Sequence, residues 1–301
     1  MTTSQDTSVV AGEFDYSLKI DCTTVDSSVA AAHGLAIAIK VEAQDLQHLR
    51  YGNAAALATS LSFWFRSPKT GIHTVSIFQE DANRSYVREF TIASADTFEF
   101  FSVFYPGDTS GTITNNTGPG ISLVFPLAWG SSFNISADTW TGTGGTPSTT
   151  SNQQNLLDNT ANNIYITGVK WEVGEVATAF EHEDIGTTLE RCHRYFHRQT
   201  RLSSTNTLIA QGKANTTTIG EFSMSWSVDM RVAPTLTVSD VTEFLIRHTN
   251  TTVQTTGLTA SAAGTKSVLL VATVSSGLTA DESVALQIRL DDDYLEFSAE
   301  L

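Results

Sequence analysis

The stretch YITGVKWEVGEVATAFEHEDIGTTLERCHRYFHR, residues 165–198, changes its pattern of apolar residues halfway along and thereby divides the chain. Its first half has the short apolar runs and turn residues that are typical of two strands. In its second half, Leu189, Cys192 and Phe196 recur at the spacing of one face of a helix. We therefore predict a short linker helix over 184–198 that joins two domains.

The chain before this helix has the pattern of a β-sandwich. Its alternating or wholly apolar runs are separated by clusters of Gly, Asn, Asp and Thr, and the expected strands cover 61–66, 72–78, 86–92, 98–105, 121–127 and 164–172. Strands at this spacing favour layered sheets over alternating strands and helices. We expect a jelly-roll-like β-sandwich over 14–183, preceded by a small, polar and flexible arm over 1–13.

The chain after the helix alternates more regularly. Phe222, Met224 and Trp226 alternate with serines, as in a strand with one buried and one solvated face. The final residues, YLEFSAEL at 294–301, repeat the alternation. We therefore predict a smaller β-sandwich over 199–301. The predicted fold class is all-β, with two jelly-roll-like β-sandwich domains joined by a short helix.

Composition and charge exclude several classes of protein. Hydrophobic residues make up 41% and aromatic residues 9% of the 301 residues, which is typical of folded domains. The 32 acidic residues outnumber the 17 basic ones, and a formal net charge of −15 disfavours nucleic acid as a partner. No apolar run is long enough for membrane insertion, and the first residues lack the pattern of a secretory signal.

The two cysteines, Cys22 and Cys192, are too few to define a disulfide framework. We expect both thiols to be reduced and partly buried. A Cys22–Cys192 bridge and a bridge between subunits are the alternatives.

Four blocks in order along the chain carry a family resemblance. They are QHLRYGNAAALATSLSFWFRSPKTGIHTVSIFQED at 47–81, FYPGDTSG at 104–111, ITGVKWEVGEVATAFEHEDIGTTLERCHRYF at 166–196 and SSGLTADESVALQIRLDDDYLEFSAEL at 275–301. Together they resemble a group of bacteriophage and prophage virion structural proteins, which are tail-fibre or capsid-surface proteins with a carbohydrate-binding-module-like jelly roll.

The resemblance implies a role and partners. The protein would be a non-catalytic virion component, a tail fibre, spike or other particle-surface protein, which contacts other virion proteins and in some cases host glycans. It would be a homo-oligomer, with a trimer favoured, and would be located in the virion. A structural calcium ion in the sandwich loops is implied by this resemblance alone, and no other cofactor is expected. A capsid decoration or cement protein is one alternative, and a stand-alone carbohydrate-binding module is another.

The sequence offers no catalytic residues. The segment GDTSG at 107–111 lacks the G-x-S-x-G spacing that exposes a nucleophilic serine, so a turn between strands is the better interpretation. Glycoside hydrolysis requires two carboxylates on opposite sides of a sugar bond, and no acidic pair is placed in that way by its spacing. We therefore predict that the protein is not an enzyme.

A glycan site is the main ligand hypothesis, with the alternative that the loops are plain surface. Sugars stack their apolar faces on exposed aromatic rings, while short polar side chains bind their hydroxyl groups. Two tryptophans lie in or beside the long Gly-, Thr-, Ser- and Asn-rich segment 107–163. The candidate ligand-binding residues are Trp129, Trp140, Asn115, Asn116, Asn134 and Asp138.

The run 98–105 predicts a covered surface. Phe98, Phe100 and Phe104 lie on one face of the expected strand, and the opposite face is apolar as well. Because one face of a two-layer sandwich normally meets water, apolar residues on both faces imply a cover. That cover is either a loop of the same chain or another subunit, and the resemblance favours a subunit interface at these phenylalanines.

His193 and His197 are weak candidates for a metal site. They are four residues apart on the predicted helix, a spacing at which two imidazoles can bind one metal ion. The favoured interpretation is that they flank the apolar stripe of the linker helix, so we predict no metal site.

Overall fold

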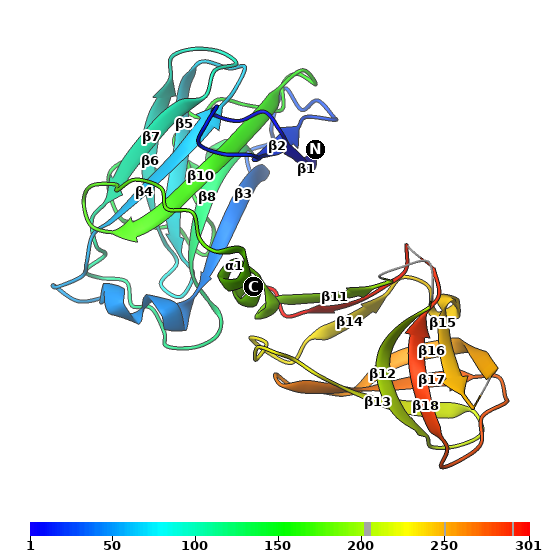
Figure 1. Ribbon diagram of the computed structural model, residues 1–301. Coiled ribbons are helices and arrows are strands. Elements are labelled where there is room, and N and C mark those ends of the chain that lie inside the picture. The colour runs from blue at the N-terminus through cyan, green and yellow to red at the C-terminus, as the bar shows by residue number, and fades with distance from the viewer. Residues whose placement is uncertain (202–205, 250, 291) are drawn as a thin grey trace. The chain divides into compact units, whose positions relative to one another are not determined.

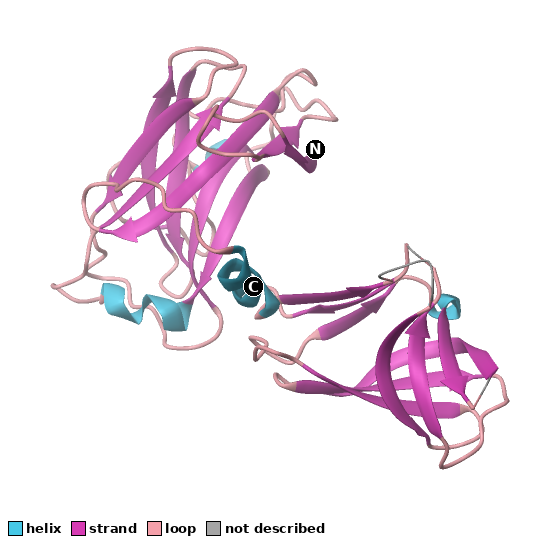
Figure 2. Ribbon diagram, in the orientation of Figure 1, coloured by secondary structure: helices cyan, strands magenta, loops and turns pink. Residues whose placement is uncertain are grey.

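The computed structural model describes residues 1–201, 206–249, 251–290 and 292–301 (Figure 1). The chain divides into two compact units, Met1–Glu181 and His182–Leu301. Strands dominate both units, which confirms the predicted all-β class (Figure 2).

The N-terminal unit contains two five-stranded antiparallel sheets. The first sheet has the order β1 (Thr2–Asp6), β2 (Ser17–Asp21), β10 (Asn163–Val173), β4 (Thr59–Arg66) and β7 (Glu99–Tyr105). The second sheet has the order β3 (Gly34–Glu42), β8 (Pro119–Trp129), β5 (Gly71–Gln79), β6 (Arg84–Ile92) and β9 (Thr141–Gly142). Side chains from both sheets form one apolar core, as the jelly-roll-like pattern requires.

Aromatic residues hold the two sheets together. Phe63 of β4 is fully buried, and its ring centroid lies 5.1 Å from that of Phe125 in β8 and 5.2 Å from that of Phe90 in β6. The hydroxyl of Tyr105 in β7 donates a hydrogen bond of 3.1 Å to the carbonyl oxygen of Val75 in β5. Edge-to-face rings and a satisfied hydroxyl are how large aromatic side chains pack in a core.

The beginning of the chain differs from the prediction. Residues 1–13, predicted as a flexible arm, begin with the paired strand β1, in which Thr3 lies opposite Ile20 of β2. Backbone hydrogen bonds to β2 therefore fix Thr2–Asp6, although these residues have no apolar pattern. Strand pairing of this kind depends on backbone hydrogen-bonding groups, which nearly every residue carries. It therefore cannot be predicted from the side chains of a polar segment.

Part of the long segment 130–162 is anchored on the outer face of the second sheet. The Thr74 and Thr149 hydroxyl oxygens are 2.8 Å apart, and the Gln153 side-chain oxygen accepts a hydrogen bond of 2.7 Å from the Thr74 backbone nitrogen. The amide nitrogen of Gln153 donates to the carbonyl oxygen of Pro126 at 3.1 Å. These bonds give the loop a fixed position on the sheet.

The C-terminal unit contains a closed barrel of six strands. Their order is β12 (Thr207–Ala214), β13 (Ile219–Ser225), β17 (Ser267–Val274), β16 (Thr251–Ala263), β15 (Phe244–His248) and β18 (Ser283–Ile288). A three-stranded sheet accompanies the barrel, in the order β11 (Phe196–Thr200), β19 (Tyr294–Ser298) and β14 (Thr235–Val238). The predicted smaller sandwich over 199–301 is thus a barrel in which β12 pairs with both β13 and β18.

The linker helix is shorter than predicted. The helix α1 covers Ile185–His193, and Asp184 caps it by accepting hydrogen bonds from the backbone nitrogens of Gly186 and Thr187. The strand β11 begins at Phe196, so the predicted helix over 184–198 includes the start of a strand. Three short 3-10 helices complete the described elements: η1 (Ala43–Leu49), η2 (Ser131–Phe133) and η3 (Val241–Glu243). Within the described ranges, no helix has the length and apolar character that crossing a membrane requires.

Candidate functional site

An aromatic face covers part of the outer surface of the first sheet. Leu61, Phe63 and Phe65 of β4 point into the core, so Trp64 and Arg66 point outward. On β7 the alternation places Phe101 and Val103 against the core and Phe100 and Phe104 outside. We define the aromatic face as Trp64, Phe98, Phe100, Phe104 and Tyr165.

Four rings of the aromatic face contact one another in two pairs. The Trp64 and Phe100 ring centroids are 5.3 Å apart, and those of Phe98 and Tyr165 are 6.2 Å apart. The guanidinium of Arg66 lies 4.8 Å from the centroid of the Tyr165 ring. Phe100 is 51% exposed, which is high for a phenylalanine side chain. Phe98, Phe100 and Phe104, which the sequence predicts to mark a covered surface, all point outward. Phe98 and Phe100 each contact one other ring of the aromatic face, and Ser102 lies between Phe100 and Phe104.

One end of the aromatic face is fixed by an arginine from the second sheet. Arg88 Nε donates a hydrogen bond of 2.5 Å to the carbonyl oxygen of Phe104, and its guanidinium carbon lies 5.8 Å from the Phe104 ring centroid. The same guanidinium forms a 2.5 Å ion pair with Asp138. The predicted glycan residue Asp138 thus has an internal partner, and it positions Arg88 at the edge of β7.

Trp140 lies partly inside the molecule. Its Nε1 donates a hydrogen bond of 2.9 Å to the carbonyl oxygen of Pro106. Its ring makes edge contacts with Tyr51 and Tyr86, at centroid distances of 5.9 Å and 5.4 Å. A tryptophan with its polar atom bonded and its edge packed against the core presents little of the flat surface on which a sugar stacks.

Trp129 is placed differently, at the end of β8. Its ring stacks on Phe133 with a centroid distance of 5.2 Å and an interplanar angle of 25°. The ring also lies directly against Gly34, where a β-carbon would come within 1.8 Å of the indole. The absence of a side chain at Gly34 therefore allows the indole to lie flat against the backbone of β3.

The remaining candidates are separated along the sheet. Asn115 and Asn116 are exposed and lie just before β8 begins at Pro119, whereas Trp129 ends that strand. An eleven-residue strand extends roughly 30 Å, since each residue advances about 3.3 Å. The two asparagines and Trp129 therefore do not share one monosaccharide site.

Asn134 lies in a polar groove with residues that the sequence did not single out. The groove has a volume of about 590 Å³ and is lined by Glu89 of β6 together with Asn134, Thr150 and Asn152 from the loops. The Thr150 hydroxyl and the Asn152 amide donate hydrogen bonds of 2.5 Å and 3.0 Å to Glu89 Oε1. Glu89 occupies an ordinary outward position in a strand, so no local signal in the sequence indicates its role.

The two candidate histidines stack on each other. His193 ends α1 and His197 lies on β11, and their rings stack at 4.2 Å with an interplanar angle of 17°. His197 also stacks on Trp226 at 5.0 Å. Burial lowers the pKa of His197, and the neighbouring His193 lowers it further. In the described part of the chain, no three His, Cys, Asp or Glu side chains gather as a metal site requires.

The two cysteines are both free thiols. Cys22 directly follows β2 and is 2% exposed, so it is more deeply buried than the partial burial that we expected. Cys192 is exposed on α1, which differs from the expected partial burial.

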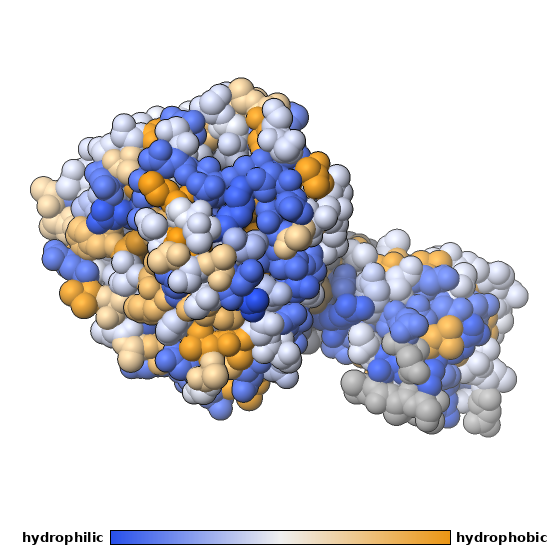
Figure 3. Space-filling model, turned by 90° about the horizontal axis from the view of Figure 1, so that it is seen from above, coloured by the Kyte–Doolittle hydropathy of each residue, from blue (hydrophilic) through white to orange (hydrophobic). Residues whose placement is uncertain are grey.

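Figure 3 shows one face of the molecule, on which hydrophobic residues form small separate groups among hydrophilic ones. This is the ordinary appearance of a protein surface, on which single exposed apolar residues are common.

Comparisons with known proteins show no family. No protein-family model matches this chain, and no curated protein matches it. A solved structure described as the crystal structure of HCR/D-Sa-GBL1/C has a TM-score of 0.28 and 8% identity, over 94% of this chain and 92% of that chain. The crystal structure of Cucumber Necrosis Virus has a TM-score of 0.19 and 10% identity, over 100% of this chain and 90% of that chain. Scores this low carry no argument about fold or function.

Proposed function

We propose that this chain is a non-catalytic structural protein of a bacteriophage virion, a tail fibre, spike or other particle-surface component that assembles through the aromatic face. The observation that carries the proposal is the outward group of Trp64, Phe98, Phe100, Phe104 and Tyr165 on the first sheet, with Phe100 half exposed. The family resemblance of the sequence supports the virion as the location of the protein. The all-β fold suits a rigid structural component.

Burial of the aromatic face supplies the driving force for assembly. Removing apolar surface from water is worth roughly 25 cal/mol per Å², and Trp, Tyr and Phe are enriched at the centres of protein interfaces. The Phe100 ring already packs against the Trp64 ring at 5.3 Å, so both side chains lose little conformational freedom when a partner covers them. We propose a second copy as that partner, with a homotrimer as the favoured state.

Mass photometry of the purified protein at several concentrations tests this proposal. We expect oligomers, with a trimer as the main species, and we expect the variant Phe100→Ser to dissociate at concentrations where the wild type remains assembled. Leu290→Ser is the matched control, because Leu290 is a similarly exposed apolar residue, 45% exposed, in the other unit. A wild-type protein that remains monomeric at micromolar concentration contradicts self-assembly. If that monomer binds purified capsids, the alternative role as a decoration or cement protein is favoured.

Glycan binding is a second candidate function, and the polar groove favours it. Carboxylate, amide and hydroxyl groups of Glu89, Asn134 and Thr150 face one open depression, and such groups bind sugar hydroxyls. A glycan array tests the candidate, with Glu89→Gln and Asn134→Ala expected to weaken any signal. Unchanged glycan-array signals in both variants would exclude the polar groove as the glycan-binding site. In that case Trp129→Ala and Trp140→Ala test the predicted aromatic platforms, and loss of binding in the Trp129 variant alone would agree with the internal position of Trp140.

A further inference from the structure

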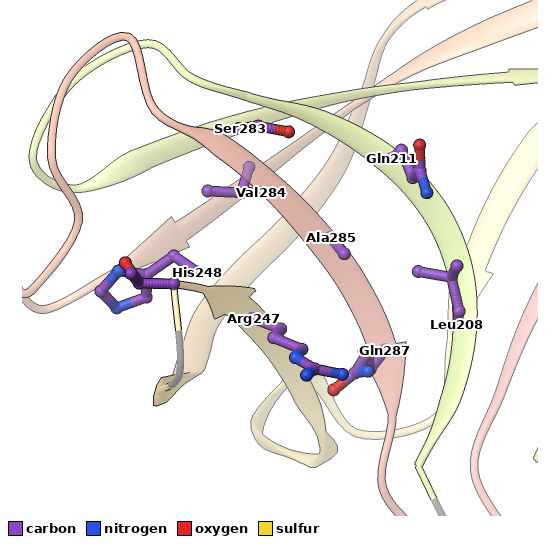
Figure 4. A pocket seen from close by; sticks show the side chains of 9 residues that line it. Leu208, Gln211, Arg247, His248, Ser283, Val284, Ala285 and Gln287 are labelled. Atoms are coloured by element: carbon purple, nitrogen blue, oxygen red, sulfur yellow. The ribbon is translucent and has the colours of Figure 1, made fainter.

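The outer wall of the C-terminal barrel has a pocket of about 350 Å³ across three neighbouring strands. Leu208 and Gln211 come from β12, Arg247 from β15, and Ala285 and Gln287 from β18, which lies between the other two strands. Figure 4 shows the Arg247 side chain extending toward Gln287, with Leu208 and Gln211 on the strand to the other side of Ala285. The volume falls in the range of small-ligand sites.

The pocket follows from the alternation of β18. Leu286 and Ile288 point into the barrel core, so Ala285 and Gln287 point outward. The strand register places Ala285 directly between Gln211 and Arg247. Because the central residue has only a methyl group and both of its neighbours have long polar side chains, the space above Ala285 is open and is bounded by polar groups.

Gln287 is the first indication of a ligand. Its side chain is 8% exposed, and it has no hydrogen-bond partner among the residues that the structure describes. Its amide atoms keep contact with solvent in the open pocket, so they are accessible and can donate to and accept from a ligand that enters it.

Arg247 is the second indication. The chain has a net charge of −15, yet this exposed guanidinium has no ion-pair partner within the described part of the chain. Acidic groups at the same end of β18 are engaged elsewhere. The Glu282 carboxylate accepts a hydrogen bond from the Thr249 hydroxyl and lies 3.4 Å from His248 Nδ1, and Asp281 pairs with Lys213 at 2.7 Å. Arg247 is therefore available for an anionic ligand.

We propose that this pocket binds a sugar residue that carries a carboxylate. The planar guanidinium of Arg247 matches a carboxylate with two parallel hydrogen bonds. The amides of Gln211 and Gln287 supply donors and acceptors for hydroxyl groups, and Leu208, which is 50% exposed, supplies an apolar wall for the face of the sugar ring. One cation, two amides and one apolar side chain correspond to a ligand with one negative charge, several hydroxyls and a nonpolar face. The site does not use the aromatic face, so it stands independently of the proposed assembly.

Isothermal titration of the full-length protein with sodium glucuronate tests the proposal. Glucose, which has the ring and hydroxyls without the charge, and acetate, which has the charge alone, are the comparison ligands. We expect saturable binding of glucuronate at millimolar concentration and at least roughly tenfold weaker binding of glucose and acetate, because each lacks one part of the recognition. Absence of glucuronate binding overturns the proposal. If acetate binds as tightly as glucuronate, the sugar ring is not recognised and the proposed ligand class is wrong.

Three variants locate the binding. Arg247→Gln removes the charge and Ala285→Leu fills the pocket from an outward position, and we expect each to weaken glucuronate binding roughly tenfold or more. Lys266→Gln is the matched control, because Lys266 is an exposed cation on the same barrel, in the turn between β16 and β17, and its loss changes the net charge equally. Equal affinity in the wild type and in Arg247→Gln overturns the site. Circular dichroism confirms that each variant retains the strand signal.

Discussion

His73 is a histidine enclosed in the core of the N-terminal unit. Its ring is 1% exposed and stacks against Phe90 at 5.8 Å, and its Nε2 lies 3.0 Å from the carbonyl oxygen of Lys69. Burial lowers the pKa of His73 below its ordinary value of 6.5. The unfolded chain therefore binds more protons than the folded one as the pH falls through this value, so the free energy of unfolding decreases with acidification.

The variant His73→Phe tests this pH dependence. It keeps an aromatic ring among Phe65 and Phe90 and removes the titrating group, although it leaves the Lys69 carbonyl without its partner. We expect lower stability at every pH but a smaller loss between pH 7 and pH 5 than in the wild type. Urea unfolding at several pH values measures this slope, with the exposed His33→Phe as control. An unchanged slope in His73→Phe would contradict the assignment.

Asp108 holds the loop that follows β7. Its carboxylate is almost fully buried and accepts hydrogen bonds from Arg84 at 2.6 Å, from Gln79 at 3.1 Å and from the Ser110 backbone at 2.9 Å. We expect Asp108→Ala to lower the free energy of unfolding by about 3 kcal/mol, because it leaves a guanidinium and an amide without their acceptor. Chemical denaturation measures the change.

A surface ion pair provides the comparison for Asp108. Asp281 pairs with Lys213 at 2.7 Å, and its side chain is 81% exposed. The variant Asp281→Asn keeps a residue that tolerates the positive φ of this position, and we expect a far smaller change in stability than for Asp108→Ala. Equal losses in the two variants would refute the role given to burial.

The contacts of single side chains were the hardest feature to predict from the sequence. Trp140 lies in a sequence of Gly, Thr and Ser that indicates a surface loop, and the partner that fixes it is the carbonyl oxygen of Pro106, 34 residues earlier. Asp138 similarly finds Arg88 on a distant strand. Phe100 was predictable, because its outward position follows from the two-residue period of β7 alone.

At the scale of elements, the capped start of α1 is a direct target. Asp184 accepts hydrogen bonds from the backbone nitrogens of Gly186 at 2.9 Å and Thr187 at 3.3 Å. We expect Asp184→Ala to destabilise the helix by roughly 1 kcal/mol and Asp184→Asn to retain most of the cap. Hydrogen exchange of the α1 amides measures the effect, with faster exchange expected in the alanine variant alone. Equal exchange in both variants would show that the cap does not hold this helix.

The strand β3 and the closure of the barrel were not predicted, for different physical reasons. The strand β3 has apolar residues at both odd and even positions, as in Leu35, Ala36 and Ile37, so it lacks the alternation that identified β5, and it also lacks the aromatic residues that identified β4. The barrel escaped because an inward-facing alternation is the same in a sandwich and in a barrel. Closure depends on β12 pairing with β18, about 75 residues further along, and nothing local encodes that pairing.

At the scale of the whole molecule, the chain has two separate hydrophobic cores. Phe63 belongs to the core of the N-terminal unit and Leu286 to that of the C-terminal unit, and both are fully buried. We expect Phe63→Ala and Leu286→Ala each to cost roughly 3–4 kcal/mol in its own unit. Scanning calorimetry is expected to resolve two transitions, each lowered by one variant. A single transition that both variants lower equally would contradict independent cores.

The division into two units was the most predictable large-scale feature. The change of period near residue 184 placed the first domain at 14–183, and the first compact unit ends at Glu181. A switch from two-residue to helical spacing is a local property, so it is visible without knowledge of long-range pairing.

The contrast between the two thiols has a practical consequence. With Cys22 enclosed and Cys192 accessible, a maleimide reagent is expected to modify the folded protein at Cys192 alone. A gold cluster coupled there would mark each copy at one defined point of α1. If the protein belongs to a virion as proposed, electron micrographs of particles that carry the marked protein would distinguish a position on the head from one on the tail, and the number of gold clusters per site would count the subunits.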